Sequence, residues 1–142
     1  MDLSPVIARL RTKLIGLRAI GGSADLDAAM RGVVVAPSAY VMPLVEQGRE
    51  IPTTGPTRQR LTSLFGVILV IENVRDNTGA ASLVDLNGLR TQLFDALVGW
   101  VPDDQVGEPV IFTSGELVQA EGDGKLWWSD EFQLISFYRS PQ

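Results

Sequence analysis

The sequence contains no cysteine and no histidine. Without cysteine the chain has no disulfide, no thiolate metal ligand and no cysteine nucleophile, which fits folding in a reducing compartment such as a bacterial cytoplasm. Without histidine it lacks the commonest general base and the commonest transition-metal ligand. These two absences remove much of the usual chemistry of enzymes. They favour a protein that acts by binding other molecules.

Long apolar runs and an excess of positive charge are also missing. The longest apolar run, Leu64 to Ile71, is far shorter than the roughly 20 residues that a helix needs to cross a bilayer. Residues 1–20 mix charged and apolar side chains, unlike a signal peptide. With 12 basic and 17 acidic residues the net charge is -5, the opposite of what phosphate neutralisation requires. We therefore expect no membrane span and no dedicated nucleic-acid binding.

What is present is enough apolar material for a core. The 142 residues are 45% hydrophobic and 20% charged, which suits one domain that folds without disulfides or a structural metal ion. No internal repeat, linker or low-complexity tract interrupts the chain. We expect a single domain over residues 1–142.

The first third of the chain shows helical and then extended patterns. Ser4 and Pro5 are a good helix start, because serine caps free amides and proline fits the first turn. Gly21-Gly22 is expected to end this helix. Its apolar stripe at helical spacing comprises Val6, Ile7, Leu10, Leu14 and Leu17.

Shorter elements are predicted next. Ser23 to Met30 has a cap and early acids, so it predicts a short helix closed by Gly32. Val33 to Val35 reads as a buried strand. After Pro37 the alternation of apolar residues predicts another strand, which Pro43 places at a sheet edge because proline cannot donate to a ladder.

A polar stretch separates that strand from the most apolar segment. Glu46 to Arg60 contains glycines and prolines without any period, which predicts a long loop. Leu61 to Val74 carries apolar residues on both parities, which indicates a strand covered on both faces. We expect this segment to be the central strand of the sheet.

The second half predicts a long helix followed by a hairpin. Ser82 and Asp85 form a capping-box pattern, and the apolar spacing continues the helix to about Gly99, before Pro102. Strands are expected at residues 110–112, 116–121 and 126–139, with a turn at residues 122–124. The predicted fold class is α+β, with helices packed on a mainly antiparallel sheet in the order helix, strands, helix, strands.

The carboxylates are the only groups left for catalysis or for a hard metal ion. Their spacing matches no calcium loop and no phosphate loop, and the acids after Pro102 suit a solvated turn. We expect no metal and no cofactor, and a carboxylate-dependent metal hydrolase is kept as a remote alternative. The acids concerned are Asp103, Asp104, Glu108, Glu121, Asp123, Asp130 and Glu131.

Four residues are candidates for contact with a partner protein. Arg58 and Arg60 flank the polar stretch, where they could meet a partner's carboxylates or merely protect a sheet edge. Trp127 and Trp128 are adjacent in a strand, so their rings point to opposite faces. One of them could anchor an interface, although cover by the domain's own helix explains it equally well.

An ordered set of short motifs in the second half resembles a bacteriophage tail-terminator family. The set begins with a helix that closes on Gly99-Trp100-Val101-Pro102. It continues with Gly115-Glu116-Leu117, Leu126-Trp127-Trp128 and Phe132. The resemblance covers roughly Leu61 to Tyr138 and is weaker over residues 1–60. From the residues alone, Gly99, Trp100 and Pro102 would form a structural corner at the helix end.

This resemblance implies a structural virion protein rather than an enzyme. It implies a ring of six copies that caps the tail tube, stops its polymerisation and offers a surface for head joining. The implied partners are other copies of the chain, the tail-tube protein and a connector or neck protein, with DNA passing through the lumen without specific binding. A neck or tail-completion protein is the nearest alternative. Assembly would take place in the host cytoplasm.

Overall fold

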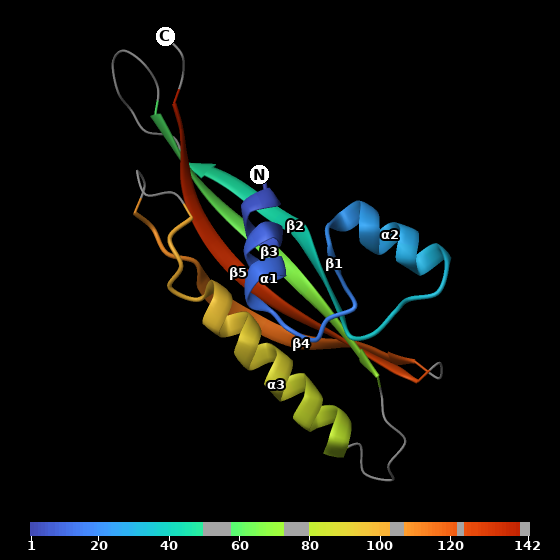
Figure 1. The fold of residues 1–142 in the computed structure, drawn as a ribbon. Coiled ribbons are helices and arrows are strands. Elements are labelled where there is room, and N and C mark those ends of the chain that lie inside the picture. Colours follow the sequence, from blue (N-terminus) through green and yellow to red (C-terminus); the bar gives the residue numbers. More distant parts are fainter. Residues whose placement is uncertain (50–57, 73–79, 103–106, 122–123, 140–142) are drawn as a thin grey trace.

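The described part of the chain folds into three helices and a five-stranded sheet (Figure 1). The computed structural model describes residues 1–49, 58–72, 80–102, 107–121 and 124–139. The strand order is β1-β2-β3-β5-β4, and all neighbours are antiparallel except β1 and β2. The predicted α+β class is confirmed. The elements are α1 (Ser4–Lys13), β1 (Ala19–Gly21), α2 (Ser23–Arg31), β2 (Ser38–Arg49), β3 (Arg58–Glu72), α3 (Ala80–Leu97), β4 (Ile111–Glu121) and β5 (Lys125–Arg139).

β3 lies at the centre of the sheet, as predicted, and its residues from Phe65 to Ile71 are covered on both faces. Because successive residues of a strand point to opposite faces, its two parities enter two different cores. Phe65, Val67 and Leu69 pack on one face with residues of α1 and α3, which lie side by side in Figure 1. Ile68 and Val70 pack on the opposite face in a smaller core with α2.

The first helix is shorter than its apolar stripe predicts. α1 ends at Lys13, and the chain then turns at Gly16, whose φ of 82° is a conformation that favours glycine. Leu14 and Leu17 still join the core, although they follow the helix. The cap also differs from the prediction. The Asp2 carboxylate accepts a hydrogen bond from the Ser4 amide at 2.9 Å, and this bond lowers the pKa of Asp2.

The strand predicted at Val33 to Val35 is wrong. These residues form no strand, and Val33 is 85% exposed. The place beside β2 is taken instead by β1, which pairs in parallel with residues 38–40. Strand propensity describes how a residue fits a sheet, but it does not supply a free neighbour with which to pair. The predicted short helix is confirmed as α2, where the Gly22 amide donates to the Asp25 carboxylate at 2.8 Å.

The predicted loop at residues 46–60 is wrong at both ends. β2 continues to Arg49 and β3 begins at Arg58, with Arg49 and Arg60 in register. The centre of the predicted loop, residues 50–57, lies outside the described residues. Pro43 does lie at an edge as predicted, because β1 pairs only as far as Tyr40. A bulge next to Pro43 shifts the register of β2 by one residue.

The long helix and the C-terminal hairpin agree with their predictions. α3 begins at Ala80, two residues before the predicted cap, and buries its leucines against the sheet. β4 is one strand rather than the two predicted pieces, with register shifts after Phe112 and Leu117. These shifts interrupt its alternation, which explains why the sequence suggested a break.

A buried ion pair fixes α3 to the hairpin. Arg90 of α3 donates to both carboxylate oxygens of Asp130 in β5, at 2.8 and 2.9 Å. Trp128 donates its indole N–H to the same carboxylate at 2.9 Å, and the Arg90 guanidinium lies 4.8 Å from the Trp128 ring. Asp130 has no exposed surface. Its charge is therefore satisfied within the chain by three donors.

Gly115 of β4 makes room for this ion pair. A Cβ at residue 115 would lie 2.6 Å from Asp130 Oδ1 and 3.1 Å from Arg90 Nη2. Real Cβ atoms do not approach so closely, so any larger residue would push the strand or the ion pair aside. The Gly115-Glu116-Leu117 motif thus has a physical reason for its first residue.

The corner predicted at Gly99, Trp100 and Pro102 closes α3. Gly99 has a φ of 83°, and its amide donates to the Val110 carbonyl at 2.8 Å. The Val110 amide donates back to the Trp100 carbonyl at 2.8 Å. The half-buried Trp100 ring packs against the main core, and the Arg9 guanidinium of α1 lies 4.8 Å from it. The corner therefore joins both helices of this face to the start of β4.

Replacing Arg90 with Met should destabilise the fold by about 3–5 kcal/mol, because Asp130 would remain buried without its cation. Urea unfolding measures this loss. Arg31→Met is the matched control, since Arg31 pairs with Asp27 at the surface, and it should cost less than about 0.5 kcal/mol. Adding Asp130→Leu to Arg90→Met should restore part of the stability. An Arg90→Met loss below about 1 kcal/mol would contradict a structural role for the ion pair.

Trp100→Ala should cost about 2–3 kcal/mol, less than the 3–5 kcal/mol typical of a fully buried tryptophan, because the ring is half-buried. Thermal and urea unfolding would give the value. Trp100→Phe keeps an aromatic face toward Arg9 and should lose clearly less. Equal losses for the two variants would argue that the contact with Arg9 contributes nothing.

Candidate assembly surface

The two tryptophans named as interface candidates are both covered by their own chain. Trp127 is buried in the smaller core, under α2. Trp128 is half-buried on the opposite face, where it contacts Arg90 and Asp130. Their rings do point to opposite faces, as predicted for neighbours in a strand. The structure therefore places neither ring on an open surface of the described chain.

Arg60 lies in a hollow at the hairpin end of β2 and β3. It is directly opposite Arg49 in register, and the hollow of about 340 Å³ is lined further by polar side chains and Ile135. Two like charges directly opposite in a sheet are unfavourable. No ion pair within the described residues offsets them. Arg58 is in register with Arg139, but the side chains of both lie outside the described part.

The hollow is open on the face of the sheet that carries α2. α2 packs only near the opposite end of β2, around Tyr40. Over the hairpin half of this face, no described helix covers the strands. The arrangement presents two cations on an open sheet face, which suits contact with a partner's carboxylates.

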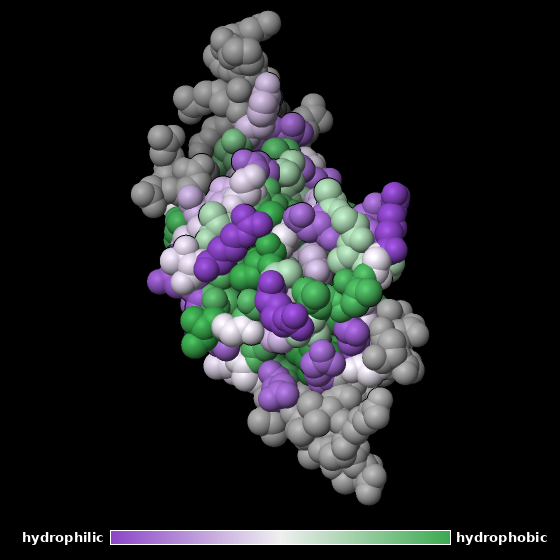
Figure 2. Space-filling view, turned by 45° about the vertical axis from the view of Figure 1, so that its right-hand side comes forward, coloured by the Kyte–Doolittle hydropathy of each residue, from purple (hydrophilic) through white to green (hydrophobic). Residues whose placement is uncertain are grey.

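The two edges of the sheet are also exposed. β4 forms one edge, and Ile111 and all of residues 113–118 are exposed. On the other side β2 has no described neighbour beyond Tyr40, and residues 44–49 are exposed. Hydrophobic residues also reach the surface between hydrophilic ones on the face shown in Figure 2. Pro43 predicted that this strand lies at an edge, but residues 46–49 were predicted to be a loop, so the length of the exposed edge was not predicted.

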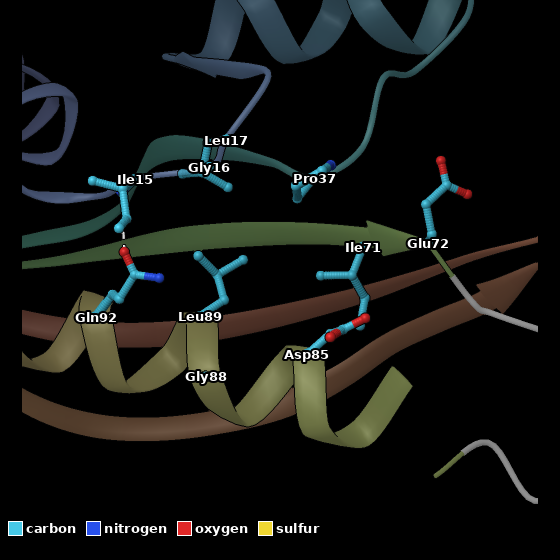
Figure 3. A pocket seen from close by; sticks show the side chains of 10 residues that line it. All are labelled: Ile15, Gly16, Leu17, Pro37, Ile71, Glu72, Asp85, Gly88, Leu89 and Gln92. Carbon is cyan, nitrogen blue, oxygen red and sulfur yellow. Dashed lines mark hydrogen bonds between the residues drawn. The ribbon is translucent and has the colours of Figure 1, made fainter. Parts of the chain in front are cut away.

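A cavity of about 410 Å³ lies between α3 and the segment joining α1 to β1 (Figure 3). The Gln92 side chain accepts a hydrogen bond from the Ile15 amide at 3.0 Å and ties that segment to α3. Gly88 contributes no side chain, while Leu89 and Ile71 line the wall. The lining also includes the carboxylates of Glu72 and Asp85 and contains no basic side chain.

Among the described residues, the acids that could have served a metal hydrolase form no metal-binding group. Across the described ranges, no group of three or more histidines, cysteines or acids could hold a metal ion. Asp130 is committed to Arg90, and Glu131 accepts a hydrogen bond from Thr113 at 2.7 Å. Asp103, Asp104 and Asp123 lie outside the described residues, as does the side chain of Glu121, and Glu108 is half-buried. None of the described helices combines the length and the apolar character needed to cross a membrane.

Comparison with known proteins identifies the family. A search of curated protein sequences gave no match. The family model described as phage tail terminator protein matches residues 1–140, so the match includes the first 60 residues, where the motif resemblance was weaker. A family of this kind points to a structural role in the phage tail and to a component of the virion. The chain therefore belongs to the phage tail terminator protein family.

Proposed function

We propose that this chain closes into a ring, with six copies, on the last ring of the tail tube. There it stops tube polymerisation and presents the surface to which the head is joined. The observation that carries the proposal is the family match over residues 1–140. The described fold supports it, because two free sheet edges and an open sheet face are available for contacts with other subunits.

A ring is the assembly that such a role requires. When each subunit uses one surface to bind a different surface on the next, the contacts either close into a ring or continue as a filament. A closed ring has no free lateral surface left, while its two axial faces can differ. One axial face can therefore bind the tail-tube protein and the other a connector or neck protein.

The charge of the chain suits a DNA conduit. The net charge of -5 disfavours tight binding to phosphates, so DNA would pass through the lumen without specific contacts. Arg60 and Arg49 are two of the cations on the described surface, and we assign them to a partner protein's carboxylates. We propose that assembly takes place in the host cytoplasm, where a chain without cysteine folds without any redox requirement.

A phage that encodes this chain should make abnormally long tails, or tails that fail to join heads, when the gene is deleted. Electron microscopy of lysates measures tail length and head attachment. Supplying the protein from a plasmid should restore both. Tails of normal length that join heads without the protein would refute the terminator role.

Arg60→Ala should reduce the recovery of joined particles in that complementation assay while leaving the stability of the subunit unchanged or slightly higher. The reason is that Arg60 faces Arg49 across the strands, so its removal relieves repulsion within the subunit. Particle counts test the expected loss of joining, and thermal unfolding of the purified variant tests the expected stability of the subunit. Arg31→Ala serves as control, because Arg31 lies on α2 away from this hollow. Full recovery with Arg60→Ala would remove Arg60 from the candidate interface.

A further inference from the structure

The hairpin end of the sheet, where β2, β3 and β5 extend beyond α2, has an excess of positive charge. Residues 47–64 and 132–139 contain four arginines and one acid, although the whole chain has a net charge of -5. The acid, Glu50, lies outside the described residues, and the arginines are Arg49, Arg58, Arg60 and Arg139. Arg49 and Arg60 are register partners, and no ion pair within the described residues uses either of them. Two like charges that face each other on a sheet favour an anion between them.

The described acids nearest to this arginine pair do not neutralise it. Glu46 lies on the opposite face of β2, because successive residues of a strand alternate, and it pairs with the amino group of Met1 at 3.1 Å. Glu131 is six residues along β5 from the position opposite the β3 arginine, which is about 20 Å. Its carboxylate accepts a hydrogen bond from Thr113 at 2.7 Å. Within the described residues the arginine pair therefore has no carboxylate of its own.

Apolar side chains continue the same face from the arginine pair toward α2. Val45 and Leu64 are register partners, and Leu64 has the parity of Ile68, which packs in the smaller core with α2. The bulged Leu44 also lies on this face, because its side chain is 3.3 Å from the position of a Cβ at Gly66. Leu44 and Val45 are 47% and 42% exposed. Adjacent exposed apolar side chains are typical of an interaction surface.

The face thus changes from apolar to basic over a short distance. Val45 and Arg49 are four residues apart on β2, which is about 13 Å. Thr62 and Ile135 line the hollow between them. A phosphate backbone would satisfy the arginines but would leave the apolar side chains exposed to water. A protein segment that carries both an acid and apolar residues satisfies the whole face.

We propose that this face binds one segment of another tail protein, which places apolar side chains on Leu44 and Val45 and a carboxylate between Arg49 and Arg60. Charge complementarity sets the direction of the segment, because only its acidic end suits the arginine pair. A second copy cannot bind through the same surface, since the described part of that surface offers no carboxylate. The inference rests on the proposed function, which supplies tail proteins as partners, and it gives the chemistry of the segment that binds.

Carbodiimide cross-linking tests for the carboxylate, because it joins an amine to a carboxylate in direct contact. Arg49→Lys and Arg60→Lys keep the charge and supply an amine, and the natural lysines are only Lys13 and Lys125. Tails from the complemented deletion phage are treated, and mass spectrometry identifies the joined peptides. Position 49 or 60 should be joined to an acid of another tail protein that has apolar residues beside it. Arg18→Lys is the matched control and should give a several-fold lower yield, since Arg18 is exposed but does not line the hollow.

Val45→Ser tests the apolar part of the same face. Added to Arg49→Lys, it should reduce the cross-linking yield several-fold, because the partner's apolar side chains lose their contact. Val33→Ser is the matched control and should leave the yield unchanged, since Val33 is 85% exposed but lies outside these strands. Thermal unfolding should show that both variants fold. An unchanged yield with Val45→Ser would overturn the proposed apolar contact.

The remaining outcomes overturn the proposal in distinguishable ways. A product joined to Glu50, or to any other acid of this chain, would show that the chain supplies the carboxylate itself. A DNA gel shift at low salt that is lost with Arg60→Ala but kept with Val45→Ser would assign the face to phosphates. No product in tails that the variants complement would overturn the contact and leave the terminator role standing.

A failure of the proposed function has a different signature. If deletion of the gene leaves normal tails that join heads, the terminator role fails. Cross-linking in purified particles that contain the protein then decides the contact alone. Absence of the protein from those particles would overturn the function and the contact together.

Discussion

The position of α3 depends on one buried carboxylate. Asp130 points into the core from β5, and a carboxylate there is stable only with donors beside it. Arg90 of α3 supplies two N–H donors, and Trp128 of β5 supplies a third. Gly115 leaves the space that the pair occupies. This contact tolerates little displacement, so it fixes the positions of α3, β5 and the edge strand β4 relative to one another.

An ion pair of this kind contributes little net free energy to folding. Its main effect is to fix the position of α3 on the sheet. Removing two charges from water costs several kcal/mol, and their attraction in the core offsets this cost only when the geometry is good. Leucines along α3 could pack on the sheet in more than one register, whereas the guanidinium can meet the carboxylate in one. Phe94 and Phe112 lie beside the Arg90 guanidinium and cover part of it, while Asp130 is fully buried. The edge strand β4 consequently has a defined place in the subunit.

Periodicity was sufficient to predict the elements that bury a continuous apolar surface. β3, α3 and the C-terminal hairpin could be predicted because the apolar spacing within each segment is sufficient to indicate its structure. β1 could not be predicted, because three residues become a strand only through pairing with β2. Residues 46–49 were missed for a related reason. Their side chains are polar and show no strand pattern, although their backbone pairs with β3.

The candidate site was harder to predict, because it depends on residues brought together by the fold. Arg60 could be named from the sequence, but Arg49 opposite it lay inside a predicted loop. Trp128 and Gly115 belonged to recognised motifs, yet nothing in the spacing linked them to Arg90, which is 40 positions from Asp130. The apolar bulge at Leu44 is invisible in the sequence, since a bulge is defined only against the partner strand.

The strands are much longer than the helices that cover them. At about 3.3 Å per residue the 15 residues of β3 span about 50 Å. At about 1.5 Å per residue the 18 residues of α3 span about 27 Å. Much of the sheet therefore extends past α3 as a stiff arm made of paired strands rather than of loop. Such an arm carries Arg49 and Arg60 well away from the Arg90–Asp130 pair, so a partner protein that binds these arginines would contact the subunit far from its core.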